Sequence, residues 1–219
     1  MARYKRRRRW NPNFLLALIA LALLLANAVM LLRRGSPSLP GEGVALPEYV
    51  EADYLVKNEW SRPGTPLEEV NGVVIHYVGN PGTSAQANLN YFNNLALTHE
   101  TYASSHFVVG LEGEVIACVP LTEVAYASND RNADTISIEV CHGDDTGRYS
   151  DVTYKKVVEL TAWLCETFDL DPREDVIRHY DVTGKICPKF YVEHPEAWEA
   201  LKEDVAKASP WGEAVSGAD

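Results

Sequence analysis

Residues 176–189 read V-I-R-H-Y-D-V-T-G-K-I-C-P-K and place a histidine, a lysine and a cysteine within nine residues of one another. His179 follows a short apolar run, so we expect it at the end of a strand. Pro188 restricts Cys187 to an extended conformation, in which residues two apart face the same side. Lys185 and Cys187 should therefore point into one space. An imidazole, a thiolate and an ammonium around one point suggest a zinc site with a charge stabiliser, although a His and a Cys at this spacing also occur without a metal.

The N-terminal part of the chain differs in composition from the rest. Residues 1–13 are basic, and residues 14–32 form an apolar segment interrupted only by Asn27. Such a segment spans roughly 28 Å as a helix, close to the hydrocarbon thickness of a bilayer. We therefore expect a single transmembrane helix, with the basic residues inside and the remainder outside the cytoplasm. The alternative is a cleaved signal peptide, because residues 26–28 (Ala-Asn-Ala) have the form of a cleavage site.

The charge distribution supports this division. Eight of the 20 Lys and Arg residues lie in the first 34 residues, which contain no acid. The remaining 12 basic residues accompany all 31 acidic residues, so the rest of the chain carries a net charge of −19. An acidic domain is a poor partner for phosphate groups, which excludes nucleic acid as a ligand.

Composition also sets the domain boundaries. Residues 33–47 are rich in Gly, Pro and Ser and are expected to form a flexible linker. Residues 48–208 are long enough for one domain with a sizeable core. Residues 209–219 are expected to form a loose tail.

The first strand of this domain is predicted over residues 72–78, G-V-V-I-H-Y-V. It is apolar on both faces, which is typical of a strand in the middle of a covered sheet. His76 lies near its end, and the strand pattern alone favours a hydrogen-bonded core histidine over a ligand. Ser84 is the expected N-cap of a helix that runs to about Leu95.

A hairpin and a third strand region follow. Residues 105–110 and 115–119 are predicted to pair through the turn at residues 111–114. Residues 135–141, T-I-S-I-E-V-C, alternate, so that the isoleucines and Val140 face a core and Glu139 faces the other side. Glu139 could therefore reach a cleft, or be an ordinary solvated glutamate of an edge strand.

The C-terminal part of the domain completes the predicted fold. A helix is expected over residues 153–168, followed by the short strand before His179 and a last helix starting at Pro195. Strands and helices alternate around one hairpin. We therefore predict the α/β class, with a mixed central β-sheet of about five strands and helices packed on it, preceded by the single N-terminal transmembrane helix.

Four ordered motifs carry a resemblance to a known family. The stretches G-V-V-I-H-Y-V-G-N-P-G, S-S-H-F-V-V-G, D-T-I-S-I-E-V-C and I-R-H-Y-D-V-T-G-K-I-C-P-K resemble those of the zinc N-acetylmuramoyl-L-alanine amidases. This family shares its fold with peptidoglycan recognition proteins and with short phage lysozymes that are amidases. The resemblance covers about residues 54–205.

The resemblance implies a function and a set of site residues. By position, His76, His179 and Cys187 match the zinc ligands, and Glu139 and Lys185 match the catalytic pair. Two imidazoles and one thiolate leave a fourth position open for water, as in catalytic zinc sites. The implied reaction is hydrolysis of the amide between the lactyl group of N-acetylmuramic acid and L-alanine, with Zn²⁺ as cofactor and peptidoglycan as substrate. A non-catalytic peptidoglycan-binding module on the same fold is the alternative.

Three positions of the family motifs need separate comment. Ser105 stands where the short phage lysozymes have a catalytic tyrosine, which shifts proton transfer to Glu139. Tyr126 stands where many relatives have a histidine, and it either contacts substrate or packs. His106 is interpreted as structural or as a partner of the ligands.

The remaining cysteines, Cys118, Cys141 and Cys165, lie in predicted strands and a helix. In an exported protein they could form one disulfide and leave one free thiol. The strand and helix pattern favours small buried hydrophobic residues instead.

Overall fold

Six short strands form one sheet in the computed structural model, which describes Leu16, Leu21 and residues 38–209. The strands are β1 (Val50–Ala52), β2 (Val73–Ile75), β3 (Phe107–Val109), β4 (Val115–Ala117), β5 (Ile136–Val140) and β6 (Val176–Arg178). Their order is β1-β4-β3-β5-β2-β6. The β3–β4 hairpin is antiparallel and every other pair is parallel, so the sheet is mixed as predicted.

The predicted number of strands was too low by one, because β1 was missed. β1 has three residues, V-E-A, and only Val50 is buried. A strand this short at the edge of a sheet shows no alternation that could identify it. It pairs with β4, and Val50 lies opposite Val115.

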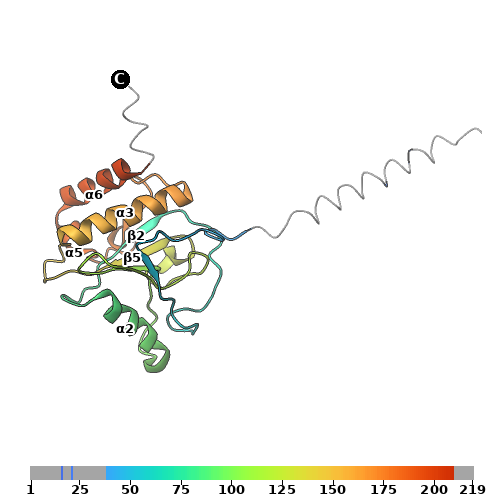
Figure 1. Ribbon diagram of the computed structural model, residues 1–219, viewed down its shortest axis with the longest axis horizontal. Helices are drawn as coiled ribbons and strands as arrows, with labels where there is room; N and C mark the ends of the chain where they lie inside the picture. The colour runs from blue at the N-terminus through green and yellow to red at the C-terminus, as the bar shows by residue number, and fades with distance from the viewer. Residues whose placement is uncertain (1–15, 17–20, 22–37, 210–219) are drawn as a thin grey trace, which may run out of the picture. The chain divides into compact units, whose positions relative to one another are not determined.

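Helices cover both faces of the sheet (Figure 1). The helices α3 (Asp151–Phe168) and α6 (Pro195–Ala208) lie on one face, and α2 (Ala85–Thr98) lies on the other. The larger core joins β2 and β5 to α3 and α6 and contains Ile75, Ile138, Leu160 and Leu201. The smaller core joins α2 to β3 and β4.

The predicted alternation of β5 is confirmed. Ile136, Ile138 and Val140 belong to the larger core, whereas Cys141 belongs to the smaller core on the opposite face. Glu139 is therefore on the α2 face of the sheet. The predicted N-cap of α2 is also confirmed, because Ser84 Oγ accepts a hydrogen bond from the Ala87 amide at 3.2 Å.

Three short helical segments surround the C-terminal ends of β2 and β6. They are the 3-10 helix η1 (Asn129–Ala133), α4 (His179–Thr183) and α5 (Lys189–Glu193). His179 is thus the first residue of α4 and not the last residue of a strand, because β6 passes directly into this helix. Gly184 ends α4 with a φ of 76°, which supplies the predicted turn.

The predicted basic segment (residues 1–13) and membrane segment (residues 14–32) lie outside the described residues, apart from Leu16 and Leu21. So do most of the predicted tail and the first residues of the linker. Within the part of the chain that the structure describes, no helix combines the length and the apolar character needed to cross a bilayer.

Candidate active site

The site lies on the α2 face of the sheet, beside the helix rather than beneath it. The helix α2 packs against β3 and β4. On this face the neighbouring strand β5 instead presents the polar side chains of Ser137 and Glu139, whereas β2 presents the apolar Val74. His76, one residue beyond β2, donates its backbone N–H to the Ile138 carbonyl at 2.9 Å, so it lies beside Glu139.

Three potential metal ligands converge at this point. The ligand atoms of His76, His179 and Cys187 all lie within 4.8 Å of one another, and all three residues are buried. The rings of His76 and His179 have centroids 4.6 Å apart, and Cys187 Sγ lies 3.8 Å from His76 Nδ1. The parallel pairing of β2 with β6 brings the two histidines together, because Ile75 and Arg178 are in register.

Two residues of the η1 region orient the imidazoles. His76 Nε2 lies 3.1 Å from Ser128 Oγ, and His179 Nε2 lies 3.0 Å from Asn129 Oδ1. Each histidine therefore uses Nε2 for a protein partner, and its Nδ1 is left for a metal. Partners of this kind fix the orientation and tautomer of ligating histidines in metalloproteins. Neither Ser128 nor Asn129 was identified from the sequence.

Burial sets the protonation of the three side chains. It lowers the pKa of His76 well below its usual value, and the positive charges of His179 and Lys185 lower it further. It raises the pKa of the Cys187 thiol to about 12. Neutral imidazoles are what a metal requires, and a buried thiol becomes a thiolate when a cation binds it. A buried donor set of two nitrogens and one sulfur fits Zn²⁺.

Glu139 and Lys185 lie beside the three ligands but differ in exposure. Glu139 is half-buried, and its Oε2 is buried without a hydrogen-bond partner among the described residues. Burial raises the pKa of the Glu139 carboxyl to about 8, and the Lys185 ammonium opposes this rise. Lys185 is exposed, and its charge also lowers the pKa of His179. A carboxyl without a hydrogen-bond partner in the described part of the chain, beside an exposed cation, suits proton transfer and charge stabilisation.

Ser105 and His106 are structural. Ser105 Oγ is buried and donates to the backbone carbonyls of Phe107 and Ser137, at 3.0 and 2.9 Å. His106 Nδ1 accepts from the Ser137 amide at 3.0 Å, and His106 Nε2 lies 2.9 Å from the Glu123 carbonyl. Neither side chain bonds to a candidate ligand.

The four cysteines are all free and buried, so the interpretation of Cys118, Cys141 and Cys165 as small buried residues is confirmed.

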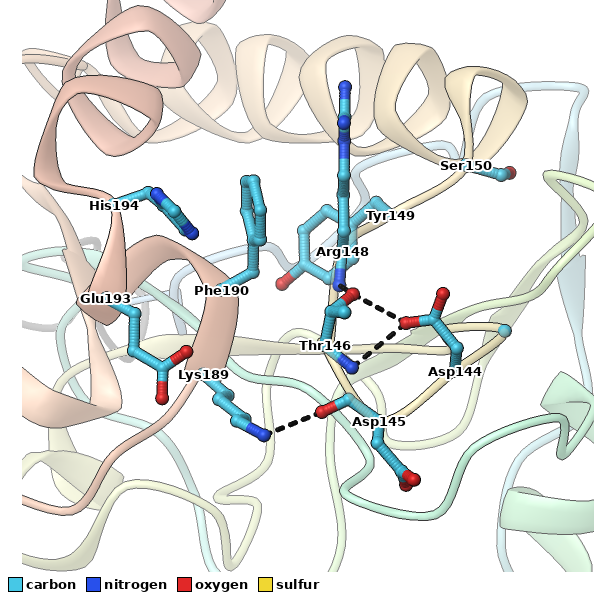
Figure 2. Close-up of a pocket in the computed structure, with 11 residues that line it drawn as sticks. Asp144, Asp145, Thr146, Arg148, Tyr149, Ser150, Lys189, Phe190, Glu193 and His194 are labelled. Carbon is cyan, nitrogen blue, oxygen red and sulfur yellow. Dashed lines mark hydrogen bonds between the residues drawn. The ribbon is translucent and has the colours of Figure 1, made fainter.

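A pocket of about 740 Å³ lies next to the site, between the loop at residues 143–150 and α5 (Figure 2). Its lining is charged and includes Asp145, Arg148, Lys189 and Glu193. Lys189 Nζ donates to the Asp145 carbonyl at 2.7 Å, which closes one side of it. The Tyr149 hydroxyl donates to the His76 carbonyl at 3.0 Å and so joins this loop to the site.

The fold and the site together define an α/β protein with a candidate catalytic metal centre. Comparison with known proteins identifies the family. The model of the N-acetylmuramoyl-L-alanine amidase family matches residues 66–190, and the chain belongs to this family.

Individual relatives agree with this assignment. The N-acetylmuramoyl-L-alanine amidase BlyA of Bacillus subtilis (strain 168) is 35% identical over 183 residues, 74% of this chain and 48% of BlyA. The amidase CwlL of Bacillus licheniformis is 36% identical over 157 residues, 65% of this chain and 42% of CwlL. The chain thus spans about half the length of the curated relatives it matches. A mutant endolysin from Bacillus subtilis has the same fold, with a TM-score of 0.60, 22% identity, and coverage of 71% of this chain and 97% of the endolysin.

Proposed function

We propose that this chain is a zinc-dependent hydrolase of the amide bond between the lactyl group of N-acetylmuramic acid and L-alanine in peptidoglycan. The observation that carries the proposal is the cluster of His76, His179 and Cys187, whose ligand atoms lie within 4.8 Å of one another, beside the Glu139 Oε2 that is buried and, within the described residues, unpartnered. A non-catalytic recognition module would have no need of an unpaired carboxyl next to a three-ligand centre. Membership of the amidase family supports the reaction class.

In this proposal the three ligands hold Zn²⁺, which supplies Lewis acidity toward water and toward a carbonyl oxygen. The ionised form of Glu139, which the neighbouring Lys185 ammonium favours, accepts the proton of the attacking water and then delivers it to the leaving amine of L-alanine. The carbon–nitrogen bond breaks and leaves a free lactyl carboxylate. Lys185, being exposed and flexible, brings its ammonium to the oxyanion that develops on the lactyl carbonyl.

In this mechanism Ser128 and Asn129 orient the two histidine ligands and do not contact the substrate bond. Their hydrogen bonds occupy Nε2 of His76 and His179, so each Nδ1 would be free to bind the ion. We further propose that the enzyme works outside the cytoplasm, tethered by the segment at residues 14–32.

The deciding experiment is incubation of residues 35–219, loaded with zinc, with purified muropeptides. Free L-alanine amines should appear without new reducing sugar ends. New reducing ends would indicate a glycosidase, and absence of any cleavage under full zinc loading would favour the recognition module.

A pair of variants tests the role of Glu139. Glu139→Gln keeps the shape of the side chain but cannot take a proton, so turnover should fall by about 10²- to 10⁴-fold at normal zinc content. Ser105→Ala is the matched control, because Ser105 bonds only within the sheet and should change turnover far less. Loss of zinc from Glu139→Gln would instead make Glu139 part of the metal shell, and normal turnover would remove it from the mechanism.

A further inference from the structure

A stack of aromatic rings lies near the candidate metal centre. The ring of Trp60 stacks on the ring of His99, with centroids 4.8 Å apart and an interplanar angle of 13°. It also stacks on the ring of Tyr102, with centroids 4.5 Å apart and an angle of 19°. Tyr102 and Tyr126 form a T-shaped pair, with an interplanar angle of 86° and centroids 5.6 Å apart. Tyr102 is nevertheless 50% exposed. The stack thus orients Tyr102 while leaving half of the residue's surface accessible to solvent.

Tyr102 and Tyr126 line a pocket of about 240 Å³, together with Ala127, Asn129 and Asn132. Asn129 connects this pocket to the candidate metal centre, because its Oδ1 is the partner of His179 Nε2. A ligand in the pocket would therefore contact Asn129, which is hydrogen-bonded to the candidate metal ligand His179.

The two asparagines leave hydrogen-bond donors in the pocket. Asn129 Oδ1 is engaged by His179, and Asn132 Oδ1 accepts from the backbone amides of Ala127 and Ser128. In residues 38–209, neither side-chain NH₂ group has a hydrogen-bond partner. The pocket therefore offers aromatic surface and free amide donors, and none of its lining residues is charged.

This chemistry distinguishes the two parts of the proposed substrate. Stem peptides carry carboxylates and amines, which match the charged pocket of Figure 2 better. An N-acetylated sugar ring is uncharged, offers C–H groups to the negative face of an aromatic ring, and has an acetamido carbonyl and hydroxyls that accept hydrogen bonds.

We propose that the pocket lined by Tyr102, Tyr126, Asn129 and Asn132 is a subsite for an N-acetylhexosamine ring of the glycan strand. The inference rests on the proposed function, whose substrate supplies that ring. Tyr102 is the stacking platform and Trp60 holds it in place. The asparagine amides donate to the acetamido carbonyl or to hydroxyls of the sugar.

The test uses a probe that contains neither the stem peptide nor the scissile bond. A tetrasaccharide of N-acetylglucosamine is titrated into the zinc-loaded protein and binding is followed by calorimetry. Tyr102→Leu, which keeps apolar bulk without an aromatic face, should weaken binding by about tenfold or more, as expected when one stacking contact is lost. Tyr102→Phe should bind like the wild type, because the ring remains.

Tyr91→Ala is the matched control, since Tyr91 is also an exposed tyrosine (43%) but lies on α2 and does not line the pocket. It should leave binding unchanged. With intact muropeptides, Tyr102→Leu should raise KM and leave kcat close to normal. A variant with a damaged zinc site would instead have a lower kcat.

The outcomes separate this inference from the proposed function. Equal binding by wild type and Tyr102→Leu, or no binding of the tetrasaccharide by a protein that cleaves muropeptides, overturns the subsite alone. If Arg148→Ala weakened binding of the tetrasaccharide and Tyr102→Leu did not, the sugar would bind in the pocket of Figure 2, and the proposed subsite would be wrong. Tyr102-dependent binding by a protein that cleaves nothing would support the subsite and refute the proposed hydrolysis.

Discussion

His106 should make the domain sensitive to acid through a mechanism separate from the candidate metal centre. Its Nδ1 accepts from the Ser137 amide, so the proton of the neutral ring is on Nε2, which donates to the Glu123 carbonyl. A second proton would set a ring N–H against a backbone N–H inside the core. Burial accordingly lowers the pKa of His106 from 6.5 to about 4, although its bond to the Glu123 carbonyl opposes the change.

The sign and size of the effect follow from this difference in pKa. Between pH 6.5 and pH 4 the unfolded chain binds a proton at His106 that the folded chain does not, so the free energy of unfolding falls as the pH falls. At about 1.4 kcal/mol for each pH unit, the loss is about 2 kcal/mol at pH 5 and about 3 kcal/mol at pH 4 and below. Above pH 7 His106 is neutral in both the folded and the unfolded chain, so it adds no pH dependence to the free energy of unfolding.

The assay compares His106→Gln with the wild type by urea unfolding at pH 8 and pH 5, with zinc removed from both so that metal release does not contribute. Gln keeps a neutral donor for the Glu123 carbonyl but leaves the Ser137 amide without its acceptor, so the variant should be less stable at pH 8 by about 1–3 kcal/mol. The difference should shrink by about 2 kcal/mol at pH 5, because only the wild type carries the penalty of His106. An equal difference at both pH values, or an NMR titration of His106 near pH 6.5, would refute the reasoning.

Four further predictions concern the metal, its support, the fold and the location. Cys187→Ser should sharply weaken zinc binding and abolish hydrolysis, because a neutral hydroxyl is a poor zinc ligand; stoichiometric zinc after dialysis would contradict the ligand set. Asn129→Ala should lower zinc affinity by about 10- to 100-fold in a chelator competition, and an unchanged affinity would show that its imidazole partner is held by other contacts. Ser84→Ala should reduce the free energy of unfolding by about 1 kcal/mol in urea without changing turnover, since it removes only the cap of α2. The full chain should remain with membranes after a high-salt wash, and a chain starting at Gly35 should be soluble; a mature protein beginning at Val29 would show cleavage instead.

Local patterns in the sequence determined most of the helices and strands and the orientation of one candidate catalytic side chain, that of Glu139. The alternation of β5 placed Glu139 opposite Ile138, and the structure has the same arrangement. Ser84 marked the start of α2, and the turn at residues 111–114 marked the β3–β4 hairpin. These features depend on neighbours a few residues apart, so the sequence carries them directly. The site residues themselves were suggested by resemblance to a family, because spacing alone could not link His76 with a segment about a hundred residues later.

The tertiary structure alone decided how distant segments meet. The register of β2 and β6 brings His76 close to His179. The pairing of β1 with β4 adds a strand that could not be predicted from its own three residues. The roles of Ser128 and Asn129, and the stacking of Trp60 on Tyr102, also arise only in the folded chain. Such contacts join residues 42 to 103 positions apart, and they depend on how layers pack and which strands pair. No periodicity within a segment encodes them.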